Sequence, residues 1–349
     1  MLKVNREILL EALSVVNHAV AKKASMPVLT HIRLSMDRNR GTVTGTDLEN
    51  TVIFPIEGNC ARKVDILLPA KKLQEILKNV QSNEQDINID LNNGKASVNH
   101  AEINTLPAEE YPVLPEIKKS VRLELQDFEP VMKKAVIAAG EHDTRYMLNS
   151  VLLDFKNNAV VATDGHRLHK IDFKFGIDHP QVIMPIATAK LIRGEVIKAR
   201  IDSTFGVFEN GRYTVFCRFM DGTYPDWQRV IPEKSTVKIT VNRRELIELA
   251  QESVPMVRER ANAGRVTVTG NTLCIESINP ELGFNKSAIK AECKGSSEFV
   301  FGINLGYMLD TLRQLKNDSV TLQMTEALSP IKITEKGFIA LVMPMRVEG

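Results

Sequence analysis

The chain has 349 residues, 43% hydrophobic and 25% charged, which is enough apolar material for real cores and too much for a disordered chain. Its formal net charge is only +2, so any nucleic-acid-binding face must come from segregated charge rather than from an excess. No run reaches the roughly 20 apolar residues of a membrane span, and the start MLKVNREILLEAL is not that of a secretory signal. The four cysteines show no CxxC spacing, so we expect unpaired buried thiols in a reducing cytoplasm.

The first third of the chain begins with an amphipathic helix. Leu9, Leu13, Val16 and Val20 share one stripe of a helix expected from Arg6 to about Ala21, with Asn5 as its N-cap. A second helix is expected over residues 71–79. Strands are expected over Leu29–Met36, Arg40–Thr46 and Asn50–Glu57, and a hairpin around Asn92-Asn93-Gly94 joins Asp86–Leu91 to Lys95–His100.

The middle third contains a strand pair that ends in a bend. Ser150–Phe155 and Ala159–Thr163 read as strands, and Gly165 permits a tight bend directly after them. Helices are expected over residues 126–139 and 187–198, the latter weakened by Gly194. In the last third, helices are expected over Arg243–Ser253 and Leu305–Leu315.

The three thirds share one order of elements. Each opens with a strand and a helix, later repeats strand, break and helix, and closes with strands and prolines. The Thr-Asp bend at Thr163 also has a counterpart, since Thr42–Glu49 runs as a strand into Thr46-Asp47; Thr272–Glu281 is a weaker third version. We therefore predict an α+β protein of three repeated domains, residues 1–120, 121–234 and 235–349, each with two helices and antiparallel sheet.

Motifs of common enzymes are missing from the sequence. It has no GxxxxGKS phosphate loop, no GxGxxG after a strand and no GxSxG elbow. One alternative stays open: a metal-dependent nucleic-acid enzyme using Asp164, His166 and His169. An Asp between a strand and a turn is more often an Asx-turn residue, and we favour that interpretation for Asp47 and Asp164.

Seven short motifs occur in an order and spacing that identify a family. They are TGTDLE from Thr44, LPA from Leu68, TLPAEEYP from Thr105, RYMLN from Arg145, ATDGHRL from Ala162, YPDWQRVIP from Tyr224 and VMPMR from Val342. Across essentially its whole length the chain resembles the bacterial sliding clamp, the β subunit of the replicative DNA polymerase III.

The resemblance implies a non-catalytic processivity factor without a cofactor. Two chains would form a head-to-tail ring that encircles duplex DNA, each chain supplying half of it. Such a lining attracts phosphates without reading bases, as scattered Lys and Arg do. The DNA-facing candidates are Lys22, Lys23, Lys71, Lys72, Lys133, Lys134, Lys190, Arg193, Arg313 and Lys316, with His142, Arg145 and Tyr146 as a second cluster.

The resemblance also implies a pocket for linear motifs of the polymerase, the clamp loader and other clamp-motif proteins. Apolar and Met side chains suit such a site because they adapt to Leu or Phe. Its main cavity would involve Leu148, Thr163, Gly165, His166, Arg167, Leu168, Pro225, Arg229, Val230, Leu341 and Met343. A neighbouring groove would involve Arg145, Met147, Asn304, Tyr307, Leu328, Pro330 and Met345.

The chain departs from the family pattern at several places. Met147 and Pro330 replace a usual Tyr and Ser, residues 185–187 lack a basic pair, and residues 347–349 extend past the usual end. The ring-closing contact would join the first domain of one chain to the third of the other, around residues 255–264. A second alternative is a peptide-binding adaptor that does not encircle DNA.

Overall fold

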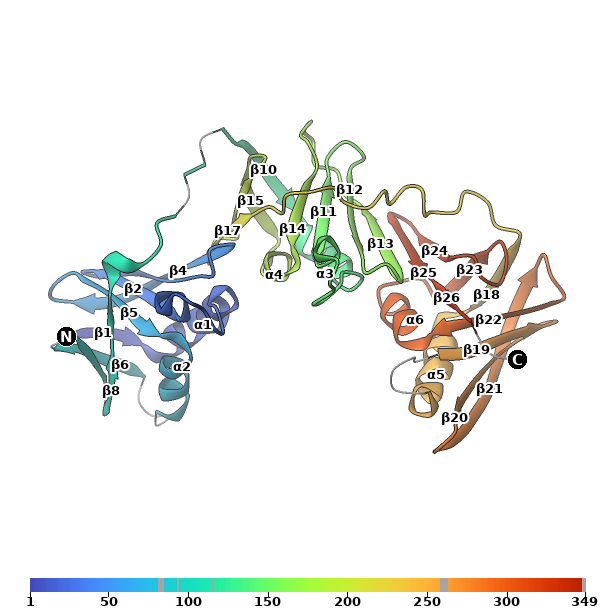
Figure 1. Ribbon diagram of the computed structural model, residues 1–349, viewed down its shortest axis with the longest axis horizontal. Coiled ribbons are helices and arrows are strands. Elements are labelled where there is room, and N and C mark those ends of the chain that lie inside the picture. The colour runs from blue at the N-terminus through green and yellow to red at the C-terminus, as the bar shows by residue number, and fades with distance from the viewer. Residues whose placement is uncertain (81–84, 93, 115, 118, 258–262, 347–349) are drawn as a thin grey trace. The chain divides into compact units, whose positions relative to one another are not determined.

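The computed structural model describes residues 1–80, 85–92, 94–114, 116–117, 119–257 and 263–346. This part of the chain holds six α-helices and two 13-stranded antiparallel sheets (Figure 1). None of its helices is long and apolar enough to cross a membrane. The chain divides into two compact units. Unit 1 is Met1–Glu129 with Ala187–Asp221, and unit 2 is Pro130–Ile186 with Gly222–Gly349.

Unit 1 holds the first sheet and the helices α1 and α2, which contact each other (Figure 1). Its helical elements are α1 (Arg6–Val16) and α2 (Ala70–Asn79), most of α4 (Ile186–Ala189), and the 3₁₀ turns Asn17–Ala19, Pro27–Thr30 and Ala108–Glu110. Its strands are β1 (Leu2–Asn5), β2 (His31–Asp37), β3 (Arg40–Thr46), β4 (Asn50–Cys60), β5 (Val64–Pro69), β6 (Asp86–Asn92), β7 (Lys95–Val98), β8 (Ala101–Asn104), β9 (Leu106–Pro107), β10 (Val121–Gln126), β15 (Val196–Ile201), β16 (Phe205–Glu209) and β17 (Thr214–Arg218).

Unit 2 holds the second sheet and the helices α5 and α6, which also lie side by side (Figure 1). Its helical elements are α5 (Arg243–Ser253) and α6 (Leu305–Leu312), most of α3 (Phe128–Val136), and the 3₁₀ turns Tyr146–Leu148 and Val254–Met256. Its strands are β11 (Ser150–Asp154), β12 (Ala159–Thr163), β13 (Arg167–Asp172), β14 (Val182–Pro185), β18 (Val237–Asn242), β19 (Ala263–Thr269), β20 (Thr272–Asn279), β21 (Gly283–Lys294), β22 (Glu298–Asn304), β23 (Ser319–Met324), β24 (Ile331–Glu335), β25 (Phe338–Val342) and β26 (Pro344–Met345).

The strand-then-helix start of the first and last thirds is built alike. Asn5 accepts hydrogen bonds from the backbone N–H groups of Glu7 and Ile8, and Asn242 accepts them from Arg244 and Glu245. Each side chain pairs with two backbone N–H groups that would otherwise be unsatisfied at the start of a helix. Helices α1 and α5 therefore both begin directly after the capping Asn. The predicted bounds of α5 are confirmed. Helix α1 ends at Val16 rather than Ala21, with one 3₁₀ turn after it.

The expected helix over residues 187–198 is wrong. Helix α4 covers only Ile186–Ala189, and β15 begins at Val196. Between them Gly194 adopts a φ of 120°, a conformation that is readily available only to glycine and ends any helix. Lys190 and Arg193 therefore lie in the connection between α4 and β15 and not on a helix face. Helices α3 and α6 are also shorter than expected, ending at Val136 and Leu312.

Strands of the predicted middle domain join both sheets. In unit 1, β17 pairs with β4, from Thr214 opposite Ile53 to Cys217 opposite Asn50. In unit 2, β13 pairs with β25, from Arg167 opposite Val342 to Ile171 opposite Phe338. The compact units therefore divide the middle third between them, and the three-domain boundaries stay a prediction.

Candidate functional site

The bend after β12 is held by a Thr and an Asp side chain. The Thr163 hydroxyl donates to the Arg167 carbonyl at 2.7 Å and accepts from the Gly165 N–H at 3.0 Å. One carboxylate oxygen of Asp164 accepts from the N–H groups of His166 and Arg167, both at 2.9 Å. The expected Asx turn at Asp164 is confirmed, and so is that at Asp47, which accepts from the Glu49 and Asn50 N–H groups. The Thr163 and Asp164 side chains together make four hydrogen bonds to the backbone of the bend, which favour this conformation.

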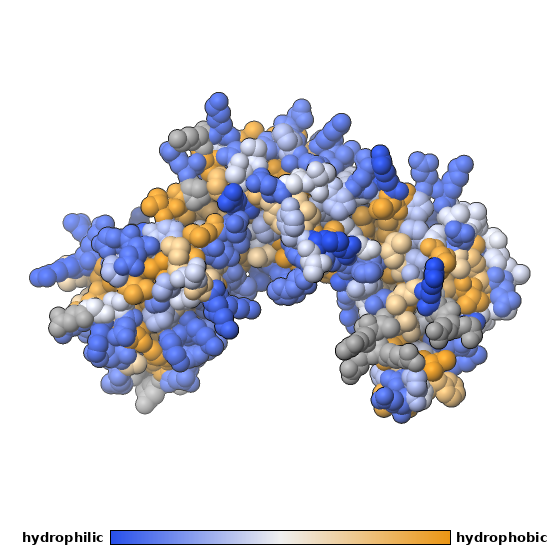
Figure 2. Space-filling model, viewed as in Figure 1, coloured by the Kyte–Doolittle hydropathy of each residue, from blue (hydrophilic) through white to orange (hydrophobic). Residues whose placement is uncertain are grey.

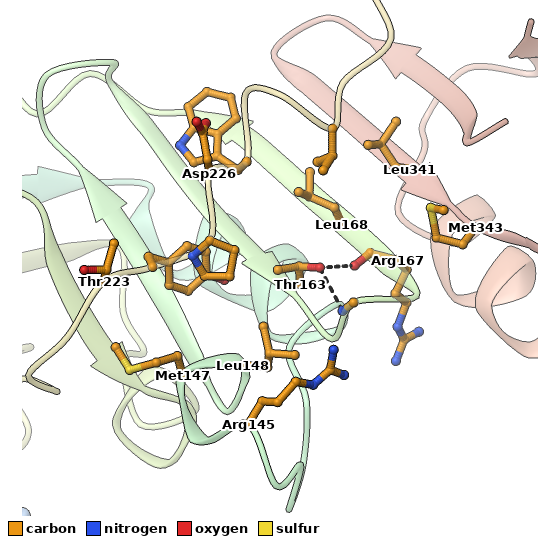
Figure 3. A pocket seen from close by; sticks show the side chains of 15 residues that line it. Arg145, Met147, Leu148, Thr163, Arg167, Leu168, Thr223, Asp226, Leu341 and Met343 are labelled. Atoms are coloured by element: carbon orange, nitrogen blue, oxygen red, sulfur yellow. Dashed lines mark hydrogen bonds between the residues drawn. The ribbon is translucent and has the colours of Figure 1, made fainter.

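A pocket of about 520 Å³ opens beside this bend in unit 2 (Figure 3). Most of its wall is apolar, which is typical of sites for hydrophobic side chains. Its lining residues are Arg145, Met147, Leu148, Thr163, Gly165, Arg167, Leu168, Thr223, Tyr224, Pro225, Asp226, Trp227, Val230, Leu341 and Met343.

Four stretches of chain converge on the pocket. The 3₁₀ turn at Tyr146–Leu148 supplies one wall, the Thr163 bend and the start of β13 a second, and residues 223–230 a third. The fourth is the end of β25, where Leu168 lies opposite Leu341 in the sheet. The Met343 N–H donates to the His166 carbonyl at 2.8 Å, which holds the chain after β25 against the bend.

The stretch 223–230 is anchored by two aromatic side chains. The Tyr224 hydroxyl donates to the Val161 carbonyl at 3.5 Å, and its burial raises its pKa. The indole Nε1 of Trp227 donates to the buried Asp154 carboxylate at 3.2 Å. Large aromatic side chains with one polar atom suit this role because they pack broadly and still fix a direction.

Two arginines define the polar rim. Arg167 pairs with Asp164 at 3.0 Å and with Asp310 at 2.6 Å, and its guanidinium lies 4.4 Å from the centre of the Tyr307 ring. Arg145 pairs with Asp143 at 2.9 Å and donates to the Asp164 carbonyl at 3.1 Å. Hydrogen bonding to Arg145 lowers the pKa of Asp143, so this pair stays charged at neutral pH.

The structure brings together most of the residues assigned to the main cavity. Arg145 and Met147, which the resemblance placed in the neighbouring groove, also line this pocket. His166 and Arg229 are not among its lining residues: His166 stacks near Tyr307, with ring centres 6.4 Å apart, and Arg229 pairs with Asp226 at 2.9 Å. Sequence reasoning missed Thr223, Tyr224, Asp226 and Trp227, although the last three lie in the motif YPDWQRVIP.

The residues assigned to the neighbouring groove do not form one cavity. Asn304 is the N-cap of α6 and accepts from the Tyr307 N–H at 3.0 Å. Leu328 and Met345 line a separate hollow with residues from β19 and β22. Pro330 is half-buried and lines neither cavity.

The basic residues assigned to DNA are exposed, with one exception. Lys134, expected on the exposed face of α3, is half-buried with its Nζ 4.9 Å from the centre of the Phe338 ring. Burial lowers its pKa. The exposed members are Lys22, Lys23, Lys71, Lys72, Lys133, His142, Arg145, Tyr146, Lys190, Arg193, Arg313 and Lys316. Of these, Lys72 pairs with Glu75 on α2 at 2.9 Å.

The side chains of the metal alternative are engaged elsewhere. His169 is fully buried, with Nδ1 2.7 Å from the Lys134 carbonyl and Nε2 3.2 Å from the Thr311 hydroxyl. Asp164 accepts from its own bend and from Arg167. Within the described residues, no group of three His, Cys, Asp or Glu side chains is placed to hold a metal ion. The four cysteines are free, as expected, but only Cys60 and Cys217 are buried.

Comparison with known proteins gives a consistent result along the chain. Residues 1–115, 122–226 and 228–346 match the family models of the N-terminal, central and C-terminal domains of the DNA polymerase III β subunit. The chain is 28% identical over 366 aligned residues to a β sliding clamp of Pseudomonas putida, covering 99% of both.

Solved structures agree with this match. A sliding clamp from Bacillus subtilis has a TM-score of 0.88 and 25% identity over 99% of both chains. A clamp from Pseudomonas aeruginosa bound to griselimycin has a TM-score of 0.87 and 25% identity over 99% of both chains. Three domain models in sequential order, sequence relatives along the whole length and the same fold lead to one conclusion: the chain belongs to the family of DNA polymerase III β subunits, the bacterial sliding clamps.

Proposed function

We propose that this chain is a DNA polymerase processivity factor that closes as a head-to-tail homodimeric ring around duplex DNA. The single observation that carries the proposal is the sequential match of all three β-subunit domain models. The ring slides without reading sequence and tethers the replicative polymerase, the clamp loader and other clamp-motif proteins in the cytoplasm. Its role is non-catalytic.

Exposed basic side chains support the DNA part of the proposal. Lys22, Lys23 and Lys71 are exposed in unit 1, as are Lys133 and Arg313 in unit 2. Long flexible cations of this kind attract phosphates and do not discriminate between bases. They suit a protein whose hold on DNA is topological.

An edge strand in unit 1 and a half-paired strand in unit 2 support ring closure. In unit 1, β8 ends the sheet and pairs with β7 alone. In unit 2, residues 283–290 of β21 pair with β20 on one side, and β18 covers only Ala291–Lys294 on the other. The same hairpin exposes Ile278, Leu282 and Phe284, each about two-thirds or more, and Figure 2 shows orange surface at its lower end. An apolar, half-paired strand is a typical pairing surface for a second chain. Of the expected interface region, residues 258–262 lie outside the described residues.

The apolar pocket supports the tethering part. Leu148, Leu168 and Met343 offer contacts for a Leu or Phe side chain, and Arg145 and Arg167 can donate hydrogen bonds to polar groups at the rim (Figure 3). A concave apolar site with a few convergent polar groups is the usual form of a peptide or ligand pocket.

Ring formation is tested by mass and by DNA topology. Light scattering after size exclusion should give about 78 kDa, twice the 39.0 kDa of one chain. Protein loaded on nicked circular DNA should stay bound and should be released when the circle is linearised. A stable monomer at micromolar concentration, or equal retention on linear DNA, would contradict the ring and favour the adaptor alternative.

Replacing basic residues should weaken the ring's association with DNA. Lys71→Glu with Lys133→Glu should reduce loading and make the remaining binding depend less steeply on salt concentration, because each lost phosphate contact lowers the number of counterions released. Lys134 is left unchanged because it is half-buried over Phe338. Loading that is indifferent to both substitutions would argue against a DNA-lined channel.

Tethering is tested in the pocket. Leu168→Ala with Met343→Ala should weaken the binding of a labelled peptide that carries Leu and Phe by about 2 kcal/mol, which is roughly a 30-fold increase in Kd. Leu48→Ala with Leu91→Ala, two exposed leucines of unit 1, is the matched control and should bind normally. Dimer mass should be unchanged in both variants. Normal peptide affinity in the pocket variant would show that the site lies elsewhere.

A further inference from the structure

Two of the twelve methionines line the apolar pocket of unit 2. Met147 belongs to the 3₁₀ turn Tyr146–Leu148, and Met343 follows β25 directly. Met343 is 37% exposed and Met147 is half-buried, so solvent reaches both side chains. Five other methionines are 1% exposed or less and belong to the cores of the two units: Met36, Met132, Met184, Met308 and Met324. The pocket therefore presents to solvent a type of side chain that the cores conceal.

The two pocket methionines lie on opposite sides of the cavity (Figure 3). The backbone is held at both positions, because the Met147 carbonyl accepts from the Ser150 hydroxyl and the Met343 N–H donates to the His166 carbonyl. The side chains can still adjust, since a methionine has three rotatable bonds and a polarisable thioether. A chemical change at either sulfur therefore alters the wall of the pocket and not the backbone that supports it.

The thioether of Met147 is packed against the chain that leads into the third wall of the pocket. A Cβ placed on Gly222 would lie 2.8 Å from Cε and 3.3 Å from Sδ of Met147, so the thioether occupies the space that this glycine leaves open. An oxygen atom bonded to that sulfur finds no room on the side of Gly222. It either points toward the pocket or displaces the adjoining wall of residues 223–230.

The chemistry that adds such an oxygen needs only a peroxide. A lone pair of the thioether sulfur attacks one oxygen of hydrogen peroxide, an S–O bond forms and the O–O bond breaks. The proton on the transferred oxygen moves to the departing oxygen, which leaves as water. Sulfur loses two electrons, the peroxide gains them, and the product is methionine sulfoxide.

A sulfoxide in this pocket opposes the binding of an apolar side chain. The new oxygen is a hydrogen-bond acceptor, and a Leu or Phe that covers it offers no donor, so binding leaves a desolvated polar group unpaired. The two guanidinium groups at the rim already have carboxylate partners: Arg145 pairs with Asp143 and Arg167 with Asp164. Oxidation therefore lowers affinity for the same apolar anchor that the thioether form accommodates.

We propose that Met147 and Met343 form a peroxide-sensitive modification site, whose oxidation to methionine sulfoxide releases the peptide bound in the pocket. This inference rests on the tethering function proposed above. The release is reversible, since methionine sulfoxide reductases take two electrons from a dithiol, return the thioether and release the oxygen as water. Peroxide thus detaches partner proteins from this chain and spares the cores, whose methionines are concealed.

The test uses the full-length protein and a labelled peptide that carries Leu and Phe but neither Met nor Cys. The protein is treated with hydrogen peroxide, catalase removes the excess, and peptide mapping by mass spectrometry locates each added oxygen. Met147 and Met343 should be oxidised well before Met132 and Met184, and the Kd of the peptide should rise about tenfold, as expected for one unpaired polar group. Reductases for both sulfoxide epimers, supplied with dithiothreitol, should restore the original Kd, whereas dithiothreitol alone should not.

Matched variants assign the effect to the two sulfurs. Met147→Leu with Met343→Leu keeps a similar side-chain volume without sulfur. Whatever its starting affinity, the ratio of its Kd after treatment to its Kd before treatment should stay near one. Met26→Leu removes a 45%-exposed methionine of unit 1 and should show the same rise on treatment as the wild type.

Failure of this inference can be told apart from failure of the proposed function. If the untreated protein does not bind the peptide, the pocket is wrongly assigned and the modification site is overturned with it. If the untreated protein binds and its Kd stays constant after both methionines are oxidised, only the modification site is overturned. A rise in Kd that persists in the double Leu variant, or that dithiothreitol alone reverses, assigns the effect to other residues such as Cys274 or Cys293 and also overturns it. So does a melting temperature that falls equally in the treated wild type and the treated double Leu variant, because the loss of binding then reflects unfolding.

Discussion

Two bends in this chain have the same hydrogen bonds and different surroundings. In residues 46–50 the Thr46 hydroxyl donates to the Asn50 carbonyl at 2.9 Å, as Thr163 does to Arg167. Leu48 has a φ of 77° where Gly165 has 84°. The repeated Thr-Asp pair therefore determines the backbone, and the residues around it determine whether a pocket forms.

The differences lie in three side-chain positions. Gly165 leaves room for the Arg145 guanidinium, whereas Leu48 projects into solvent. Arg167, with two carboxylate partners, takes the place of the buried Asn50. His169 takes the place of the buried Val52. A bend that is only structural in unit 1 thus becomes part of a polar-rimmed cavity in unit 2.

The aspartates of the two bends should differ most in what their removal costs. Asp164→Ala removes acceptors for two backbone N–H groups and for nearly buried Arg167, so we expect a loss of about 3 kcal/mol. Asp47→Ala removes a similar turn at a more exposed site and should cost about 1 kcal/mol. Denaturant unfolding measures the free-energy cost of each substitution, and hydrogen exchange in β3 and β12 shows which bend is affected. Equal costs would mean that the Arg167 pair contributes nothing.

Low pH should also affect the two bends and their strands differently. Burial lowers the pKa of His169 to about 4, below its ordinary 6.5, so the native state keeps this ring neutral while the unfolded chain binds a proton. Its contribution is fully present above pH 6.5 and is lost as the pH falls toward 4, about 2 kcal/mol of it between pH 6.5 and 5. Exchange protection of β12 and β13, corrected for intrinsic rates, should fall over this range, whereas that of β3 and β4 should not. His169→Gln should flatten the difference, and parallel slopes in the wild type would contradict it.

The two residues with positive φ, Gly165 and Leu48, should differ in how strongly a substitution affects stability. Gly165→Ala places a Cβ 2.9 Å from Nη1 of Arg145 at a φ of 84°, and we expect a cost of about 1.5 kcal/mol with weaker peptide binding. Thermal melting and peptide titration of the same variant measure the two effects. Unchanged values for both would show that Arg145 moves aside freely.

The matching change in unit 1 should be the smallest. Leu48→Gly relieves a left-handed backbone but adds unfolded-state entropy, so the net change should stay within about 0.5 kcal/mol. Leu48 is 53% exposed, so little packing is lost. A melting temperature shifted by many degrees would indicate a contact that the bend comparison does not include.

Local features of this fold could be predicted from the sequence. Helix α5 was placed correctly because Asn242 caps a strongly patterned segment, and both Asx turns followed from Asp after a strand. Helix α4 was predicted too long because apolar spacing continued past the point where Gly194 turns the chain. The spacing of apolar residues indicates which secondary structure a segment favours. It does not show where contacts with neighbouring elements end that helix or strand.

Long-range contacts account for the rest. Nothing near Lys134 indicates that Phe338, about two hundred positions later, covers it. Trp227 lines the pocket because its indole reaches Asp154 on β11, a contact that spacing cannot reveal. The convergence of four stretches on one cavity came from the family resemblance. Of the missed lining residues, Tyr224, Asp226 and Trp227 lie inside a quoted motif, but their place in the pocket depends on contacts with distant strands.

The strand pairing between β13 and β25 has a consequence for a severed chain. Lys234 is exposed between the two strands in sequence, and a tryptic cut there would break the covalent link between residues 1–234 and 235–349. The backbone hydrogen bonds from Arg167–Ile171 to Phe338–Val342 would still hold the fragments together, as would the bond from Lys332 to the Pro232 carbonyl. The nicked protein should migrate as one species on a native gel and as two in detergent, so continuity of the polypeptide matters less to this molecule than continuity of its sheet.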